Sequence, residues 1–130
     1  MPYLYQSLTQ KIITAYYTVY NTLGYGFLEK VYENAMLQEL DSYGLKSEKQ
    51  IPISVFYKGI KVGAYFADII VDNKIILELK ASKQICLEHE YQLINYLKAT
   101  DIELGLLLNF GKKPEIRRKI FSSKKRMGND

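Results

Sequence analysis

Three charged residues close two apolar segments of the chain, at positions where a folded domain would be expected to bury only apolar side chains. Asp68 lies near the end of one segment, and Glu78 and Lys80 end the next. Burying these charges costs stability unless another interaction compensates. A divalent cation between the carboxylates would do so, and Mg²⁺ suits such a site because it keeps several water ligands. We therefore expect phosphodiester hydrolysis, with Mg²⁺ or Mn²⁺ at Asp68 and Glu78 and with Lys80 assisting the attacking water.

The turn between the two segments decides whether these side chains meet. Side chains alternate between the faces of a strand, so Glu78 and Lys80 share a face. A two-residue turn at 72–73 would place Asp68 and Glu78 on opposite faces. A three-residue turn at 72–74, or a β-bulge, would place them together. The metal-site hypothesis requires one of these last two arrangements.

The spacing of apolar residues predicts the elements that carry the site. Segment 74–80 is apolar on both faces, which predicts a central strand covered on each side. A three-stranded meander followed by a helical crossover predicts an α/β (α+β) fold, with a mixed sheet of four to five strands flanked by helices. The expected order is α-α-β-β-β-α-β, with helices at 7–22, 27–43 and 86–99, strands at 51–57, 60–71, 74–80 and 103–110, and a short edge strand at 116–121.

The composition is typical of a single globular domain. The chain has 130 residues, of which 48% are hydrophobic and 25% are charged, so we expect one domain over 1–130. The single Cys86 cannot form an internal disulfide or a cysteine-based zinc site, which fits a reducing, cytoplasmic setting. No targeting segment or apolar stretch long enough to span a membrane is apparent, so no membrane partner is expected.

Basic residues are concentrated in the C-terminal tail, residues 112–130. The tail carries a net charge of +6 within a total of +4. It can be interpreted as a solvated chain end or as a surface that contacts nucleic-acid phosphates. Its basic residues are Lys112, Lys113, Arg117, Arg118, Lys119, Lys124, Lys125 and Arg126.

The ordered set of motifs resembles a known superfamily. Asp68, followed after nine residues by Glu78-Leu79-Lys80, is similar to the PD-(D/E)XK nuclease signature of restriction-endonuclease-like folds. The segment from Gly26 to Glu33 resembles the motif that names the GxxExxY branch of that superfamily. The similarity covers about residues 8 to 121 and continues through Tyr57-Lys58-Gly59, Gln92 to Leu97, and Gly105 to Gly111.

The resemblance implies a restriction-endonuclease-like core acting on nucleic acid, DNA above all, and it assigns roles to individual residues. Asp68, Glu78 and the backbone carbonyl of Leu79 would bind the metal, and Lys80 would assist catalysis. An accessory acid is implied at Glu29, which is also a possible metal ligand. A glutamine-tyrosine pair on the helix after the lysine strand is matched by Gln92 and Tyr96.

Two positions depart from the family pattern. Ala67 replaces the signature proline, which mainly affects the local backbone, and Tyr20 stands where relatives often have His. The second departure puts any catalytic role for that position in doubt.

Other interpretations remain open at this point. Glu78 and Lys80 could form a salt bridge at a sheet edge, and Glu29 and Glu33 could serve only to complement a helix dipole. The chain could be a noncatalytic module that binds nucleic acid or protein, since a fold does not fix an activity. A small-molecule metal hydrolase is disfavoured by the basic tail. A homodimer is suggested by analogy with small nucleases that cut both strands.

Overall fold

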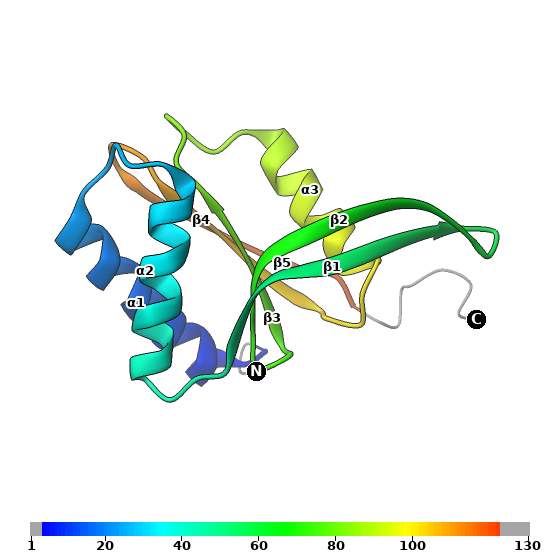
Figure 1. Cartoon of the computed structure of the whole chain (residues 1–130), viewed down its shortest axis with the longest axis horizontal. Helices are drawn as coiled ribbons and strands as arrows, with labels where there is room; N and C mark the ends of the chain where they lie inside the picture. Colours follow the sequence, from blue (N-terminus) through cyan, green and yellow to red (C-terminus); the bar gives the residue numbers. More distant parts are fainter. Residues whose placement is uncertain (1–3, 123–130) are drawn as a thin grey trace.

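The computed structural model describes residues 4–122, which form a mixed five-stranded sheet with helices on both faces (Figure 1). The element order is that expected from the apolar periodicities, with the short edge strand added at the end. The elements are α1 (Gln6–Leu23), α2 (Glu29–Ser42), β1 (Ser47–Tyr57), β2 (Ile60–Val71), β3 (Ile75–Lys80), α3 (Leu87–Lys98), β4 (Leu104–Phe110) and β5 (Pro114–Ile120).

The strands follow each other across the sheet in the order β1-β2-β3-β4-β5. β1, β2 and β3 form an antiparallel meander, and α3 carries the chain across to β4, which pairs in parallel with β3. β5 then returns antiparallel to β4. The predicted α+β fold with a mixed sheet is therefore confirmed.

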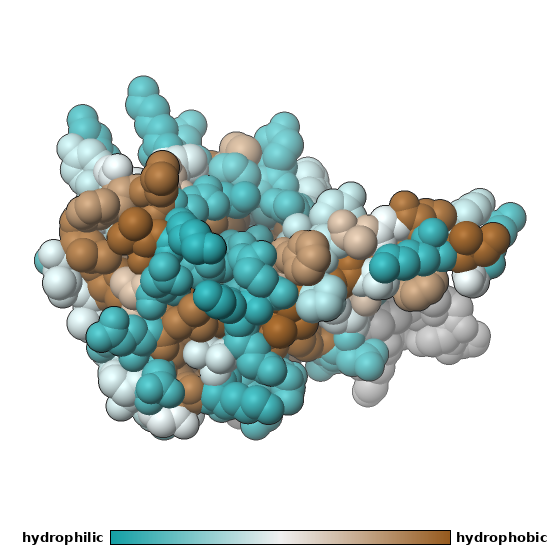
Figure 2. Space-filling view, viewed as in Figure 1, coloured by the Kyte–Doolittle hydropathy of each residue, from teal (hydrophilic) through white to brown (hydrophobic). Residues whose placement is uncertain are grey.

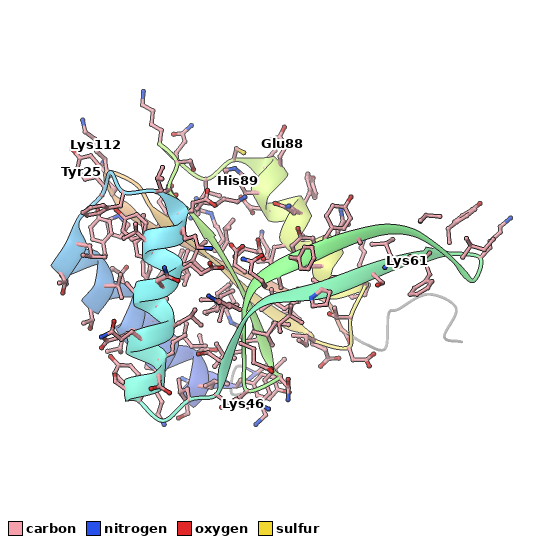
Figure 3. The ribbon with its side chains drawn as sticks, in the orientation of Figure 1. Tyr25, Lys46, Lys61, Glu88, His89 and Lys112 are labelled. Atoms are coloured by element: carbon pink, nitrogen blue, oxygen red, sulfur yellow. The ribbon has the colours of Figure 1, made fainter. Side chains whose placement is uncertain are left out.

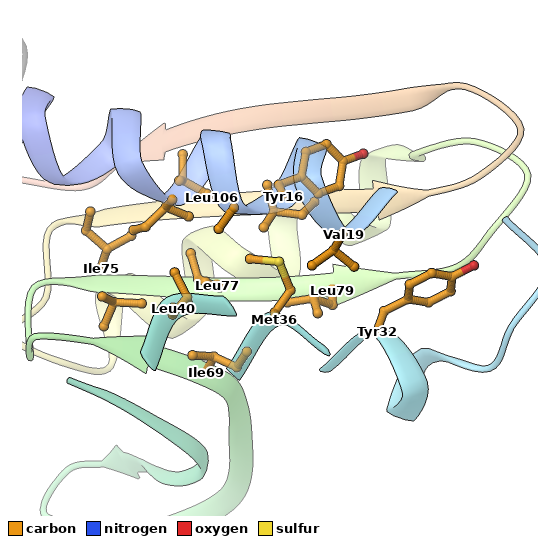
Figure 4. Close-up of a cluster of buried hydrophobic side chains, with 14 of the residues drawn as sticks. Tyr16, Val19, Tyr32, Met36, Leu40, Ile69, Ile75, Leu77, Leu79 and Leu106 are labelled. Atoms are coloured by element: carbon orange, nitrogen blue, oxygen red, sulfur yellow. The ribbon is translucent and has the colours of Figure 1, made fainter. Parts of the chain in front are cut away.

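Two apolar layers cover the sheet. On one face, α1 and α2 pack their buried side chains against the odd-numbered residues of β3, and Tyr16, Met36, Leu77 and Leu79 belong to one cluster there (Figure 4). On the other face, Leu93 and Leu97 of α3 cover the even-numbered positions. β3 lies between β2 and β4, so the interpretation of Glu78 and Lys80 as a salt bridge at a sheet edge is wrong.

Helix α2 begins at Glu29, two residues later than the periodicity predicts. The preceding Leu28 is extended, with φ −70° and ψ 154°, and Gly26 has a φ of 110°, which favours glycine. The glycine loop therefore continues to the residue before Glu29, and Glu29 occupies the first helical turn.

The basic C-terminal tail is only partly described. Its first part forms the loop after β4 and then β5, whereas Lys124, Lys125 and Arg126 lie outside the described residues. Within residues 4–122, no helix is long and apolar enough to cross a membrane.

The distal part of the β1–β2 hairpin, residues 51–66, extends past the helices (Figure 1). We call this segment the arm. At its base, Ala67 belongs to the apolar layer under α3, while Ile69 belongs to the layer under α1 and α2. Residues two positions apart on a strand normally face the same side, so the alternation of side chains along β2 is interrupted at Asp68.

Candidate active site

Asp68 and Glu78 lie opposite each other because the turn between β2 and β3 has three residues. Val71 pairs with Ile75, so residues 72–74 form the turn. Asp72 and Asn73 adopt φ values of 51° and 55°, a left-handed conformation that Asp and Asn tolerate better than most residues. The odd turn predicted from the sequence is confirmed.

The β2–β3 ladder ends just before the two acids, and their carboxylates replace it. The last backbone pair is Ile69 with Leu77. Beyond it, the backbone N–H of Asp68 donates to Glu78 Oε2 at 3.0 Å, and the N–H of Leu79 donates to Asp68 Oδ2 at 2.8 Å. Within residues 4–122, the second oxygen of each carboxylate accepts no hydrogen bond. Each acid is therefore held by one oxygen and presents the other.

Burial and neighbouring charges raise the pKa values of both carboxylates. Burial, followed by repulsion from Asp68, raises the pKa of Glu78 from 4.5 to about 8. Burial also raises the pKa of Asp68, and the charges of Glu33 and Glu29 add to this effect. The ammonium group of Lys80 lowers both pKa values. Ionising both carboxylates together is therefore unfavourable unless a cation compensates their charge.

A pocket of about 270 Å³ opens between α2 and the strands beside Asp68. The buried Glu33 accepts a hydrogen bond from Gln50 Nε2 at 2.6 Å across this pocket. Gln50 has a φ of 51°, a left-handed conformation that is unfavourable for this residue type. The lining residues are Glu29, Lys30, Glu33, Gln50, Asp68 and Leu79.

Sequence reasoning favoured Glu29 over Glu33 and did not single out Gln50. Glu29 does line the pocket, but it is exposed, whereas Glu33 is buried there. The four-residue spacing of the two acids places both on one side of α2, which was the available signal for Glu33. Nothing local to Gln50 indicates its role, since that depends on where β1 passes α2.

Tyr32 fixes the start of α2 and hence the position of Glu29. Its hydroxyl donates to the carbonyl of Gly24 at 2.6 Å and accepts from the N–H of Phe27 at 3.2 Å. Its ring stacks on Phe110 with centroids 4.2 Å apart. The tyrosine therefore ties the glycine loop to the central sheet.

The Gln92 and Tyr96 side chains join the site from α3. Gln92 Nε2 donates to the Tyr96 hydroxyl at 2.8 Å. Burial raises the pKa of Tyr96, and the charges of Glu78 and Asp68 raise it further. Tyr96 also belongs to the same apolar cluster as Ala67 and Ile76, which precede Asp68 by one residue and Glu78 by two.

A buried polar cluster supports the loop that follows Lys80. Asn109, which is fully buried, accepts a hydrogen bond from the N–H of Ser82 at 3.0 Å and donates to the carbonyl of Ser82 at 3.0 Å. Glu115 accepts from Asn109 at 3.1 Å and from the N–H of Ile85 at 3.0 Å. Because Asn109 lies opposite Lys80 in the β3–β4 register, the cluster fixes the path of the chain from Lys80 to α3.

The described basic residues of the C-terminal tail do not form one surface. Lys112 is exposed in the loop after β4, at the opposite end of the molecule from Lys61 of the arm (Figure 3), and Lys113 follows it. Arg117 and Lys119 approach Glu90 of α3 at 3.8 and 2.5 Å, whereas Arg118 donates to the Leu4 carbonyl at 3.4 Å. The two β5 cations that contact Glu90 are therefore already paired.

A divalent metal fits the carboxylate pair in charge and in ligand type. Within the part of the chain that the structure describes, no group of three or more acidic, histidine or cysteine side chains is close enough to hold a metal by itself. One oxygen of each carboxylate nevertheless accepts no hydrogen bond within residues 4–122, and Asp68 lines a polar pocket. Hard cations such as Mg²⁺ are bound through one or two carboxylates and retain several waters, so the donor set suits such an ion.

One solved structure shares the fold. It is titled "Crystal structure of SSO0001" and superposes with a TM-score of 0.56 at 18% sequence identity. The match covers 72% of the present chain but 50% of that protein, so the chain spans about half of its length. No curated protein matches the chain.

A family model described as the PD-(D/E)XK nuclease superfamily matches residues 6–119. The match includes α2, α3 and the five strands, apart from the last residue of β5. It therefore contains both Asp68 and Glu78. The chain belongs to the PD-(D/E)XK nuclease superfamily.

Proposed function

We propose that the protein is a metal-dependent nuclease that hydrolyses phosphodiester bonds of nucleic acid. The observation that carries this proposal is the Asp68–Glu78 pair, in which each carboxylate is anchored through one oxygen and leaves the other without a hydrogen bond within residues 4–122. A merely structural pair of buried acids would be expected to satisfy all its oxygens or to pair with cations. Asp68 instead lines a pocket together with two further acids, Glu29 and Glu33.

The metal, Mg²⁺ or Mn²⁺ as its substitute, would polarise the phosphodiester and lower the pKa of a bound water. Asp68, Glu78 and the Leu79 carbonyl would hold it, with Glu29 as an additional ligand. Lys80, two positions after Glu78 on the same strand, would orient the attacking water and offset charge as it develops. Glu33 would increase the negative potential at Asp68, as its effect on the pKa of Asp68 indicates.

The Tyr96 hydroxyl, which accepts a hydrogen bond from Gln92, would donate a hydrogen bond at the Glu78 side of the site. A tyrosine hydroxyl is protonated at neutral pH, so it can act as a donor there. Among the described residues of the tail, Lys112 and Lys113 are the best placed for phosphate contacts, because they are exposed and outside the Glu90 ion pairs.

We further propose that the chain belongs to the GxxExxY branch, acts on DNA in the cytoplasm, and works as a homodimer where both strands are cut. The structure gives a physical reason for the motif: Tyr32 holds the glycine loop and thereby positions Glu29 at the pocket.

The test is cleavage of labelled single-stranded, duplex and branched DNA and of RNA, with Mg²⁺, with Mn²⁺ and with EDTA. Asp68→Asn and Lys80→Gln are expected to lose at least about a hundredfold in rate. Asp41→Asn, at an exposed position near the end of α2, makes the same charge change as Asp68→Asn and serves as the control. Equal rates for all variants, or cleavage that persists in EDTA, would contradict the proposal. Binding without cleavage would identify a noncatalytic module.

A further inference from the structure

The arm exposes large apolar side chains far from the two packed layers. Figure 2 shows apolar residues interspersed with polar ones along this projection at the right of the molecule. Exposed apolar groups concentrated on one projecting element usually mark an interaction surface. The exposed fractions are 63% for Phe56, 63% for Tyr57, 68% for Ile60, 60% for Val62, 49% for Tyr65 and 55% for Phe66.

The charge of the arm has a single sign. Residues 51–67 contain no acidic residue, and their only charged residues are Lys58 and Lys61. Lys58 lies over the ring of Tyr57, with Nζ 5.4 Å from the ring centroid. An aromatic surface with cations and no carboxylates is complementary to a polyanion. It is poorly complementary to a second copy of itself, because the lysines of the two arms would repel each other.

The rings at the tip lie on both faces of the hairpin. Tyr57 pairs with Ile60 on one face, and Phe56 pairs with Lys61 on the other. A register shift between Val55 and Phe56 separates the tip from the rest of the arm. A flat protein partner would bury one face only, whereas separate unpaired bases can stack on rings that point in different directions.

We propose that the arm binds single-stranded nucleic acid, with unpaired bases stacked on Phe56 and Tyr57 and phosphates near Lys58 and Lys61. Stacking requires an accessible base face, which a paired duplex provides only at its ends, whereas a basic surface with aromatic side chains suits single strands of any sequence. Rings in this mode contribute roughly five- to 150-fold each to affinity.

The arm is continuous with the candidate active site. The ring of Tyr65 lies 5.7 Å from that of Tyr96, which packs in one apolar cluster with Ala67 and Ile76, neighbours in sequence of Asp68 and Glu78. From Ile60 to Asp68 the extended strand spans about 27 Å, at roughly 3.4 Å per residue. A strand held along the arm would lead to the carboxylate pair. This inference rests on the proposed function and narrows its substrate to nucleic acid with an unpaired segment.

The test measures binding in EDTA, so that it does not depend on catalysis. Fluorescein-labelled oligo-dT of 20 nucleotides and a 20-base-pair duplex are titrated with the full chain and followed by anisotropy. Wild type is expected to bind oligo-dT more tightly than duplex. The double variant Phe56→Ser/Tyr57→Ser is expected to lose about 25-fold or more on oligo-dT, which is the product of two rings that each contribute at the low end of this range. The variant Tyr57→Trp should retain binding.

The matched control is Tyr91→Ser. Tyr91 is 61% exposed, close to the 63% of Tyr57, but it lies on α3. Five positions separate it from Tyr96, which turns it roughly 140° away around the helix. A second variant, Lys58→Glu/Lys61→Glu, reverses the two positive charges while keeping the rings. It should weaken binding and flatten its salt dependence, because fewer counterions are released.

Several outcomes would overturn the inference. These are wild-type affinity in both arm variants, an equal loss on oligo-dT and duplex, or an equal loss in Tyr91→Ser. Sedimentation gives a further outcome. If wild type is a dimer and the arm variants are monomers that still bind oligo-dT, the arm forms a contact between two copies of the chain. If wild type cleaves nucleic acid but the arm variants bind oligo-dT as wild type does, the binding role of the arm is rejected and the proposed nuclease activity is not. If the arm variants lose binding but wild type does not cleave, the nuclease activity is rejected and the binding role of the arm is not.

Discussion

Gln50 on β1 donates a hydrogen bond to Glu33 on α2, with 2.6 Å between Nε2 and Oε2, across the pocket beside Asp68. The contact holds a buried carboxylate against the site and uses a residue in a left-handed backbone conformation. Unfavourable backbone conformations persist only where the surrounding contacts enforce them, and they are concentrated at functional sites. The Glu33–Gln50 contact therefore belongs with the site's supporting interactions.

Neutralising Glu33 is expected to weaken metal binding. Glu33→Gln keeps an oxygen to accept from Gln50 but removes a negative charge that acts on Asp68. Supporting groups around a metal commonly contribute roughly ten- to a hundredfold in affinity, so calorimetric titration with Mn²⁺ should show a loss in that range. Asp41→Asn, an exposed change of the same charge on the same helix, should leave the affinity unchanged. An unaltered affinity in Glu33→Gln would separate Glu33 from the metal site.

The stability of the metal-free protein is expected to fall as the pH rises through the pKa of Glu78. The folded state raises this pKa from 4.5 to about 8, so the folded state retains a proton that the unfolded state has lost. The stabilising contribution is complete below pH 4.5 and is lost by pH 8. The variant Glu78→Gln lacks this titration and should be more stable than wild type at pH 8.5, by a few kcal/mol in order of magnitude.

The measurement is the thermal midpoint of both proteins in EDTA between pH 5 and 8.5. The difference in midpoint should grow with pH. Added Mn²⁺ should raise the midpoint of wild type at the high end of this range, where its carboxylates are ionised, and should raise that of Glu78→Gln less. A difference independent of pH would mean that Glu78 is not the group that titrates.

The sequence predicted the parts of the site that depend on local pattern. If Asp68 and Glu78 form one site, strand alternation requires either an odd turn or a β-bulge between them, and the structure has the three-residue turn. The Glu33–Gln50 contact could not be predicted, because it joins segments that meet only through packing of α2 on the sheet. The ion pairs of Arg117 and Lys119 with Glu90 were missed for the same reason, since they depend on β5 lying beside α3.

Removing the hydroxyl of Tyr32 should loosen the start of α2 without disturbing the ring. Tyr32→Phe keeps the stack on Phe110 but leaves the carbonyl of Gly24 and the N–H of Phe27 without their partner. Urea titration should show a loss of about 1–3 kcal/mol in the free energy of unfolding. The control is Tyr17→Phe, because the exposed Tyr17 hydroxyl makes no hydrogen bond within residues 4–122. Equal stability of the two variants would contradict the role given to Tyr32.

Gly111 should not tolerate a side chain, because its backbone packs closely against the loop after Lys80. A Cβ at Gly111 would stand 2.5 Å from the carbonyl oxygen of Ser82 and 3.0 Å from Asn109 Nδ2, the two groups that hold that loop. Gly111→Ala must displace one of them, so we expect a loss of about 1–3 kcal/mol by urea titration together with reduced cleavage. Gly63→Ala is the matched control, since its Cβ would meet only ordinary contacts at 3.6 and 3.8 Å. Because Gly63 lies in a strand, that control should be neutral or slightly stabilising. Wild-type stability in Gly111→Ala would show that the loop from Lys80 to α3 can shift without cost.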